Sequence, residues 1–240
     1  MRQSAFFFLL VSLTAPFPVG GQQPDTPRGY AGANLLFAFP VGEFEENVDF
    51  GFGIGVHGRL ALDESGILSL RADLGFLNYG SETIRICITL PCRITGDLTT
   101  SNNIFLFGVG PEIGVGSGGV RLYANASIGL AYFNTTSSVE GSDNNNEPFA
   151  SSTNFDDLTF AWTAGPGAQL RVWTGQSASV LLDVGARYHG NGEARYLRKG
   201  DIRDLPDGSV ELDPQQSETN LWTFLLGVSV EIGPRTQGNF

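Results

Sequence analysis

The chain has 240 residues and a formal net charge of −11, and only 16% of its residues are charged. Because a nucleic-acid phosphate backbone requires a basic patch, this acidic composition argues against nucleic acid as a partner. A hydrophobic content of 41% excludes a disordered polyelectrolyte, and the 32 glycines follow no Gly-X-Y period, which excludes a collagen-like chain.

Residues 1–21 have the layout of a secretory signal peptide. Arg2 precedes a short apolar run, and a group of small residues follows it. We expect cleavage after Gly21, with Ala15 as the alternative, and a short lead over residues 22–27. The apolar run is too short to cross a bilayer as a helix, and the other interpretation is a buried N-terminal helix. The sequence therefore predicts an exported chain.

The rest of the sequence predicts eight β-strands. Three segments alternate cleanly between apolar and polar residues: 67–79, 120–132 and 178–188. Five others alternate less regularly: 30–39, 50–62, 103–115, 157–172 and 220–232. Strands of this length and an even strand number suit a transmembrane barrel, which crosses the bilayer with about 9–11 residues per strand.

The connections between these segments are short and long in strict alternation. The short ones are 63–66, 116–119 and 174–177, and the long ones are 40–49, 80–102, 134–156 and 189–219. Membrane barrels have this pattern, with short turns on the periplasmic side and longer loops outside, whereas a soluble sandwich has no reason for it. We therefore predict an all-β, eight-stranded antiparallel up-and-down transmembrane barrel.

Outward-facing aromatic residues gather at the long-loop end of every predicted strand. Such residues form a girdle at the membrane interface of outer-membrane barrels. The predicted girdle consists of Phe39, Phe52, Phe76, Phe105, Tyr132, Trp162, Tyr188 and Trp222.

The opposite, inward face carries charged residues, most of them near the short turns. An eight-stranded barrel has an interior just wide enough to be filled by side chains, and paired charges offset each other's burial. We therefore expect an ion-pair network that plugs the lumen rather than an open pore. Its predicted members are Arg59, Arg71, Asp73, Glu112, Arg121, Arg171, Asp183, Arg187 and Glu231.

Over about residues 28–232 this architecture resembles the small eight-stranded outer-membrane barrels of diderm bacteria, the OmpA-transmembrane and OmpX-like barrels. No short diagnostic motif carries the resemblance. It implies contact with outer-membrane lipid and insertion by the barrel-assembly machinery, which commonly reads an aromatic residue at the end of the last strand. Here that strand is predicted to stop near Ile232, and residues 233–240, ending in Phe240, are expected to form a tail.

The long connections hold seventeen acidic residues against six basic ones, so they carry the whole net charge. The first interpretation is a solvated, repulsive surface, and the alternative is a surface that binds a receptor or a cation. Cys87 and Cys92 lie in the second long connection. Because export implies oxidising conditions, we expect them to form a disulfide, with two free thiols as the alternative.

The sequence predicts no cofactor and no metal site. The motif at 53–58 matches G-x-G-x-x-G, but its glycines lie inside a strand, where a dinucleotide site requires a strand followed by a helix. His57 and His189 have no second metal ligand at suitable spacing. We expect a non-enzymatic outer-membrane barrel that presents acidic surface loops to an unknown partner. The alternatives are a small diffusion channel, a lipid-A-modifying enzyme using His189 at the external rim, and a soluble lipocalin-type carrier.

Overall fold

The structure is a computed structural model that describes residues 29–89, 91–117, 119–141, 148–175, 178–205, 207 and 209–232. The predicted signal peptide, the lead and the predicted tail lie outside these residues. Within the described ranges, no helix is long and apolar enough to cross a membrane.

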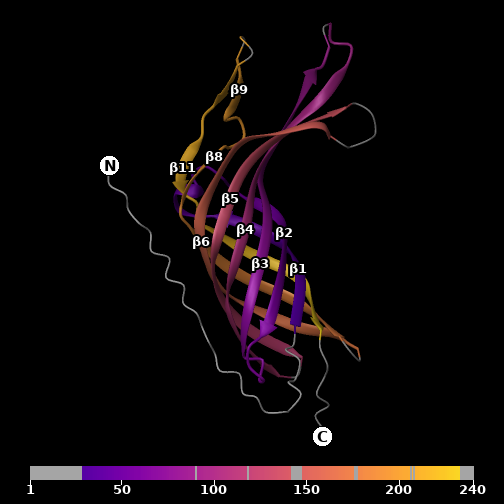
Figure 1. The fold of residues 1–240 in the computed structure, drawn as a ribbon, viewed down its shortest axis with the longest axis vertical. Helices are drawn as coiled ribbons and strands as arrows, with labels where there is room; N and C mark the ends of the chain where they lie inside the picture. Colours follow the sequence, from indigo (N-terminus) through magenta and orange to yellow (C-terminus); the bar gives the residue numbers. More distant parts are fainter. Residues whose placement is uncertain are drawn as a thin grey trace, which may run out of the picture.

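Eight strands close into one antiparallel barrel (Figure 1). They are β1 (Gly29–Pro40), β2 (Gly51–Ala61), β3 (Leu68–Cys87), β4 (Thr95–Ser117), β5 (Val120–Gly141), β6 (Pro148–Thr174), β7 (Ala178–Asn191) and β12 (Leu221–Ile232). Each strand pairs with the next barrel strand along the chain, and β12 closes the barrel by pairing with β1, with Gly29 opposite Ile232. The predicted eight-stranded up-and-down topology is confirmed.

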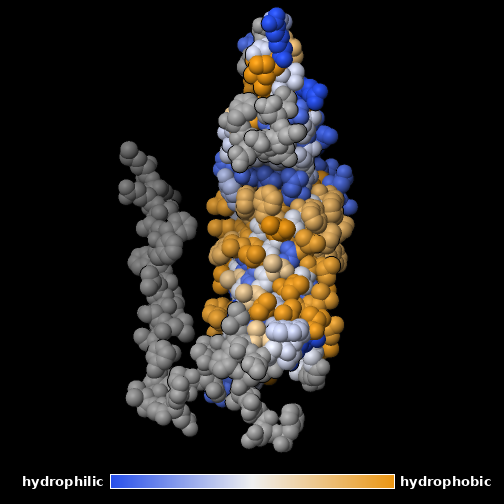
Figure 2. All heavy atoms as spheres, turned by 90° about the vertical axis from the view of Figure 1, so that its right-hand side faces the viewer, coloured by the Kyte–Doolittle hydropathy of each residue, from blue (hydrophilic) through white to orange (hydrophobic). Residues whose placement is uncertain are grey.

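The barrel wall is apolar on its outer side. Side chains on β2 alternate, so that Ile54 is 59% exposed while His57 and Arg59 face inward and are buried. The same alternation places exposed leucine, valine, isoleucine and phenylalanine side chains on the outside of all eight strands. On the face in view, Figure 2 shows apolar side chains over the wall and hydrophilic side chains beyond its upper end. An apolar exterior around a polar interior is typical of a barrel that sits in lipid.

The four middle strands are longer than the sequence predicted. The predicted connections 80–102 and 134–156 are mostly strand, because β3–β6 stay hydrogen-bonded to one another beyond the aromatic rim. These segments, 78–87, 95–103, 134–141 and 148–157, form a four-stranded sheet that we call the extension (Figure 1). They are rich in threonine and serine on one face, so they lack the apolar alternation that marks a strand half-buried in lipid.

Two further connections fold over the same end of the barrel. The first contains the short 3-10 helix η1 (Gly42–Phe44). The last contains two small hairpins, β8 (Glu193–Tyr196) with β11 (Gln215–Glu218), and β9 (Ile202–Asp204) with β10 (Val210–Leu212). We call η1, β8 and β11 the cap, because Phe44 of η1 and Tyr196 of β8 pack against Phe133 inside the barrel.

Candidate functional site

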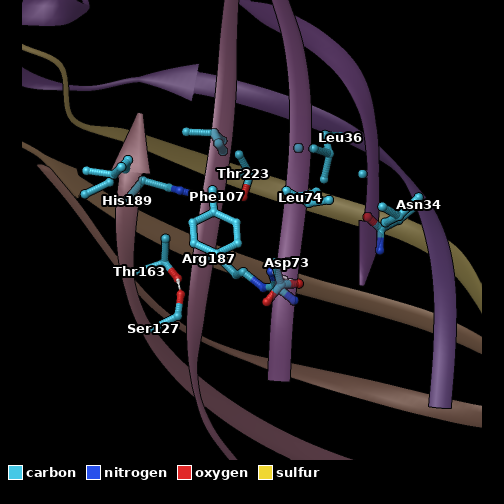
Figure 3. Close-up of a pocket in the computed structure, with 17 residues that line it drawn as sticks. Asn34, Leu36, Asp73, Leu74, Phe107, Ser127, Thr163, Arg187, His189 and Thr223 are labelled. Atoms are coloured by element: carbon cyan, nitrogen blue, oxygen red, sulfur yellow. Dashed lines mark hydrogen bonds and ion pairs between the residues drawn. The ribbon is translucent and has the colours of Figure 1, made fainter. Parts of the chain in front are cut away.

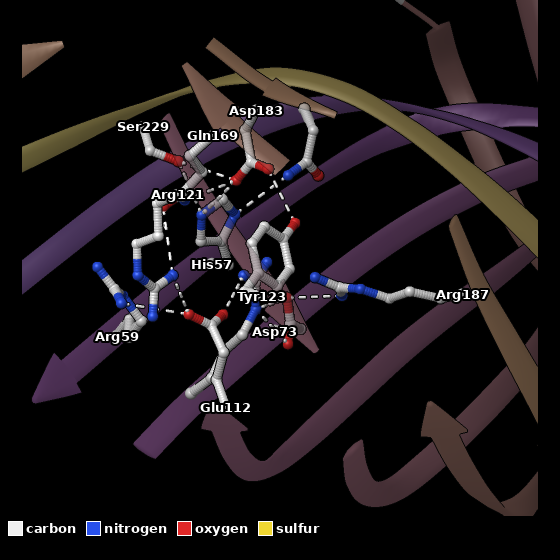
Figure 4. Close-up of polar contacts among 12 residues, drawn as sticks. His57, Arg59, Asp73, Glu112, Arg121, Tyr123, Gln169, Asp183, Arg187 and Ser229 are labelled. Carbon is white, nitrogen blue, oxygen red and sulfur yellow. Dashed lines mark hydrogen bonds and ion pairs between the residues drawn. The ribbon is translucent and has the colours of Figure 1, made fainter. Parts of the chain in front are cut away.

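The lumen near the short turns is filled by charged side chains, and Glu112 on β4 is the centre of the largest group (Figure 4). Its carboxylate is completely buried and lies 2.7 Å from Arg121 Nη1, 2.8 Å from Arg71 Nη1 and 3.2 Å from Arg59 Nη1. Side chains from four neighbouring strands, β2–β5, therefore meet at one carboxylate. Because a buried charge is tolerated only when it is paired, these contacts fix the side chains of β2–β5 relative to one another.

The two aspartates of the lumen are bound differently. Asp73 lies between two guanidinium groups, 3.0 Å from Arg71 Nε and 2.8 Å from Arg187 Nη1. Asp183 is completely buried and accepts hydrogen bonds from neutral groups instead. Its donors are Tyr123 Oη at 2.8 Å, Gln169 Nε2 at 3.0 Å and Ser229 Oγ at 3.1 Å.

Glu231 forms a separate pair at the short-turn mouth of the lumen. It lies 3.3 Å from Arg171 Nη2 and accepts a hydrogen bond from Tyr30 Oη at 2.9 Å. The Tyr30 ring in turn lies under the Arg59 guanidinium, 3.5 Å from its Cζ. Arg171 is more exposed than the other charged residues of the network, since its side chain is 39% exposed. The structure thus places the nine predicted residues on the lumen side, in groups around Glu112, the two aspartates and Glu231.

The neutral members of this network were not predicted from the sequence. Tyr123 donates to Asp183 and lies below the Arg71 guanidinium, and Asn34 Nδ2 lies 3.1 Å from His57 Nδ1. The parity of the strands already indicated these positions, because Tyr123 alternates in step with Arg121. Glycine makes room for the large side chains: a Cβ on Gly114 would overlap the Arg121 guanidinium, and a Cβ on Gly167 would overlap the Tyr123 ring.

The other half of the lumen, next to the long loops, is filled by apolar side chains. Charges alone marked the inward face in the sequence, so this apolar half was not predicted. Its members are all at most 9% exposed and include Leu36, Ala38, Leu77, Ile104, Leu106, Ala131, Phe133, Ala161, Leu221 and Leu225. The cap completes it, since the Phe44 ring is 1% exposed and contacts the rings of Tyr79, Phe133 and Tyr196. The lumen is therefore closed twice, by ions at one end and by apolar packing at the other.

The two connections that form the cap are also joined by polar contacts. Arg198 donates to Asn47 Oδ1 at 2.9 Å, which joins the first connection to the last, and to Asp201 Oδ2 at 3.1 Å. The hydrogen bond to Asp201 raises the pKa of Arg198 above its ordinary value, and burial raises that of Tyr196. Asp201 is itself buried, so this acid is part of the structure rather than a solvated surface charge.

A small cavity of about 40 Å³, lined by apolar and some polar side chains, lies between the two halves of the lumen (Figure 3). Its polar lining includes Asn34, Asp73, Thr163, Arg187, His189 and Thr223. Arg187 Nε and Nη2 and His189 Nδ1 are buried without a hydrogen-bond partner in the protein. A cavity of this size holds roughly three water molecules, which would supply those partners.

Among the described residues, neither histidine has a hydroxyl and a carboxylate on different ring nitrogens. His57 Nε2 faces both Ser229 Oγ at 3.1 Å and Asp183 at 3.6 Å, whereas a relay needs the nucleophile and the carboxylate on different ring nitrogens. His189 was expected at the external rim, but it is 6% exposed inside the lumen, with Nε2 2.8 Å from Thr223 Oγ1. Among the residues that the structure describes, no three His, Cys, Asp or Glu side chains are grouped to hold a metal ion.

The predicted girdle residues lie on the outside of the barrel, where neighbouring rings touch. Ring centroids are 5.0 Å apart for Phe76 and Phe105, 5.5 Å for Trp162 and Tyr188, and 5.4 Å for Tyr188 and Trp222. The remaining members also pair, Phe39 with Phe224, Phe52 with Phe37, and Tyr132 with Phe105. The rings thus follow one another around the wall at the level where the apolar band ends.

Cys87 and Cys92 form a disulfide at the tip of the β3–β4 hairpin. The ring that it closes is short and lies beyond the barrel, so it constrains the tip and not the wall. Replacing both cysteines by serine should cost the tip about 2 kcal/mol of chain-entropy stabilisation. We expect trypsin to cleave after the exposed Arg93 at least tenfold faster, with the heat-modifiable gel mobility of the barrel unchanged.

The rate of cleavage after Arg203, in β9, serves as the internal control for this double variant and should stay the same. A barrel that loses its folded mobility together with the disulfide would contradict the assignment of a local role.

No protein-family model and no curated protein matches the chain. Three solved structures of outer-membrane barrels are similar to this chain. Neisserial surface protein A is 14% identical over 85% of this chain and 96% of its own, with a TM-score of 0.43. The outer membrane protein OprG from Pseudomonas aeruginosa is 8% identical over 87% and 97%, with a TM-score of 0.47. Ail, the attachment invasion locus protein of Yersinia pestis, is 12% identical over 86% and 99%, with a TM-score of 0.40.

These similarities are too low to indicate the function of the chain. Its fold is established by its own strand pairing. The closed eight-stranded barrel is consistent with the resemblance to the OmpA-transmembrane and OmpX-like barrels.

Proposed function

We propose that the chain is a non-enzymatic barrel of the bacterial outer membrane that anchors the extension and the external loops at the cell surface. It would act in envelope integrity or in surface interaction. One observation carries the proposal: the lumen is closed along its length, while four strands continue past the apolar band as an ordered sheet. A molecule built this way offers structure outside the membrane rather than a path through it.

The surface of this external part is acidic. Glu43 in the cap and Glu45 and Glu46 beside it are exposed, as are Glu211 and Asp213 in the last connection. Long-range attraction would therefore favour cationic partners and repel anionic ones. Contact with outer-membrane lipid and insertion by the barrel-assembly machinery belong to the same proposal. Release of the protein into buffer without detergent would contradict it, and heat-modifiable mobility on a detergent gel would support it.

The first rival, a diffusion channel, makes an opposite prediction for conductance. Purified protein in a planar bilayer should show no steady single-channel conductance, because both the ion pairs around Glu112 and the apolar side chains around Phe44 fill the lumen. The recording should stay at the baseline of protein-free bilayers at 1 M salt. A large, steady conductance in most insertions would overturn the closed lumen.

The second rival, a lipid-A-modifying enzyme, depends on His189. The His189 ring is buried and hydrogen-bonded to Thr223. We therefore expect His189→Ala to leave the lipid A profile of expressing cells unchanged. The lipid A mass spectrum of cells expressing the original chain, of cells expressing the variant and of cells with an empty vector should be the same. A modification present only with the original chain would establish the enzyme.

A further inference from the structure

The outward face of the extension carries three consecutive rows of small polar side chains, and each row runs across all four strands. The first row is Asn78, Asn103, Asn134 and Asp156; the second is Ser81, Ser101, Thr136 and Thr153; the third is Thr83, Thr99, Ser138 and Ser151. We call these rows the polar panel. Register shifts at 78/80 on β3 and near 154 on β6 keep the side chains of the two outer strands in line with the inner ones.

Apart from Asp156, the panel is a regular lattice of neutral hydrogen-bonding groups. Strands lie about 4.8 Å apart and alternate residues about 6.8 Å apart, so hydroxyls recur at these spacings in two directions. Thr83 Oγ1 lies 3.0 Å from Thr99 Oγ1, and the Asn78 amide donates to Asn103 at 3.0 Å. Each hydroxyl still has capacity beyond one such contact, and Asn134 Oδ1 is buried without a partner in the protein.

The charge near the panel argues against an anionic ligand. The next row outward contains Arg85, which lies 3.4 Å from Asp97, and Glu140 stands beside them. This row has two acids against one base, and the panel itself contributes Asp156. A phosphate or sulfate group would find no free cation here.

The position of the panel indicates what it faces. Directly below its first row, on the same outward face, lies a row formed by Phe76, Phe105, Tyr132 and Leu158. The three rings are in contact, with centroids 5.0 Å and 6.2 Å apart. Outward aromatic rings of this kind lie at the level of lipid headgroups. The panel is therefore continuous with the lipid-facing wall and begins where the headgroups begin.

We propose that the polar panel binds the uncharged sugar headgroups of glycolipids in the membrane around the barrel. The apolar C–H face of a sugar ring packs on the aromatic row, while the exposed or half-buried hydroxyls of the rows above it donate to and accept from the sugar hydroxyls. The acidic surroundings select neutral saccharides over phosphate-bearing headgroups. This inference rests on the proposed membrane location.

Two matched triple variants test it. The outward variant is Ser101→Ala/Thr136→Val/Thr153→Val in the hydroxyl row nearest the rings, and the control is Thr100→Val/Ser137→Ala/Ser152→Ala, which also removes three hydroxyls from the same three strands but on the opposite face. The full barrel is placed in nanodiscs of equimolar phosphatidylcholine, phosphatidylglycerol and digalactosyl diacylglycerol. Native mass spectrometry then measures which lipids it retains.

We expect the original chain and the control to retain the digalactosyl lipid at least threefold over phosphatidylcholine, and the outward variant to lose this preference. No preference in the original chain, preference for phosphatidylglycerol, or equal loss in both variants would overturn the proposal. Removal of the preference by soluble dextran at equal sugar concentration would assign the panel to free polysaccharide and also overturn it. Heat-modifiable mobility of the same samples reports insertion separately, so a barrel that fails to insert rejects the proposed function by a different result.

Discussion

Replacing Glu112 by glutamine should lower the free energy of unfolding by about 3–5 kcal/mol, because it leaves the buried guanidinium groups of Arg59 and Arg71 and the partly buried one of Arg121 without their shared anion. Arg59 and Arg71 have almost no access to water, and each already has buried nitrogen atoms without partners. The glutamine side chain matches glutamate in size, so the loss measures charge rather than packing. Urea unfolding of the barrel in lipid vesicles, followed by tryptophan fluorescence, gives the free energy.

Asp183→Asn is the matched control for this prediction. Asp183 is as deeply buried as Glu112, but its three hydrogen-bond donors are neutral and no arginine pairs with it. We expect a loss below about 2 kcal/mol, the range of a single perturbed hydrogen bond. Equal losses in the two variants would mean that burial, and not the shared anion, decides the stability of this half of the lumen.

Replacing Phe44 by alanine should detach the cap. Its ring is 1% exposed and contacts three other rings, and truncation of a buried phenylalanine costs about 3–5 kcal/mol. Because the cap is formed by connections rather than by barrel strands, the loss should appear as local opening. Proteolysis within residues 192–220 should accelerate by a factor on the order of 10²–10³, since 1.4 kcal/mol corresponds to a factor of ten.

Phe50→Ala controls for the loss of an aromatic ring at the same end of the barrel, since Phe50 is 43% exposed at the outer rim. Its proteolysis rate should stay within about threefold of the original chain. The Phe44 variant should keep its heat-modifiable mobility and should still show no steady conductance, because the ion pairs close the lumen independently. Global unfolding of the Phe44 variant would show that the cap is part of the barrel's cooperative unit.

Strand number, orientation of the faces and topology were predictable because a barrel wall in lipid imposes period two on the sequence. That periodicity placed Arg71 and Asp183 inward and Phe76 and Tyr188 outward, as in the structure. The period-two pattern is lost where the strands leave the lipid. Beyond the rim the strands β3–β6 no longer face lipid, and apolar residues are too few there to mark the strands, so the extension looked like loops.

The lumen was predictable only through its charges. Inward leucines such as Leu77 and Leu225 cannot be told from lipid-facing ones by residue type, and only strict parity assigns them to the interior. Phe44 was hidden for another reason. Its ring packs on Tyr196, a residue 152 positions away in the chain, and no local sequence pattern predicts a contact between residues so far apart. His189, expected at the rim, is buried because its side chain lies on the lumen side of β7 beside Thr223 of β12.

The pairing of β1 with β12 has a consequence for the order of folding. It joins Gly29 to Ile232, whereas β3–β4 and β5–β6 are hairpins of neighbouring segments. Loop-closure entropy makes such a distant pairing slow, so the seam closes last. Tyr30 meets Glu231 directly across that seam, and His57 meets Ser229 one strand further in. A slip of two residues at closure would keep every apolar side chain facing lipid but would separate these partners, so the polar lumen acts as the check on register that lipid alone does not provide.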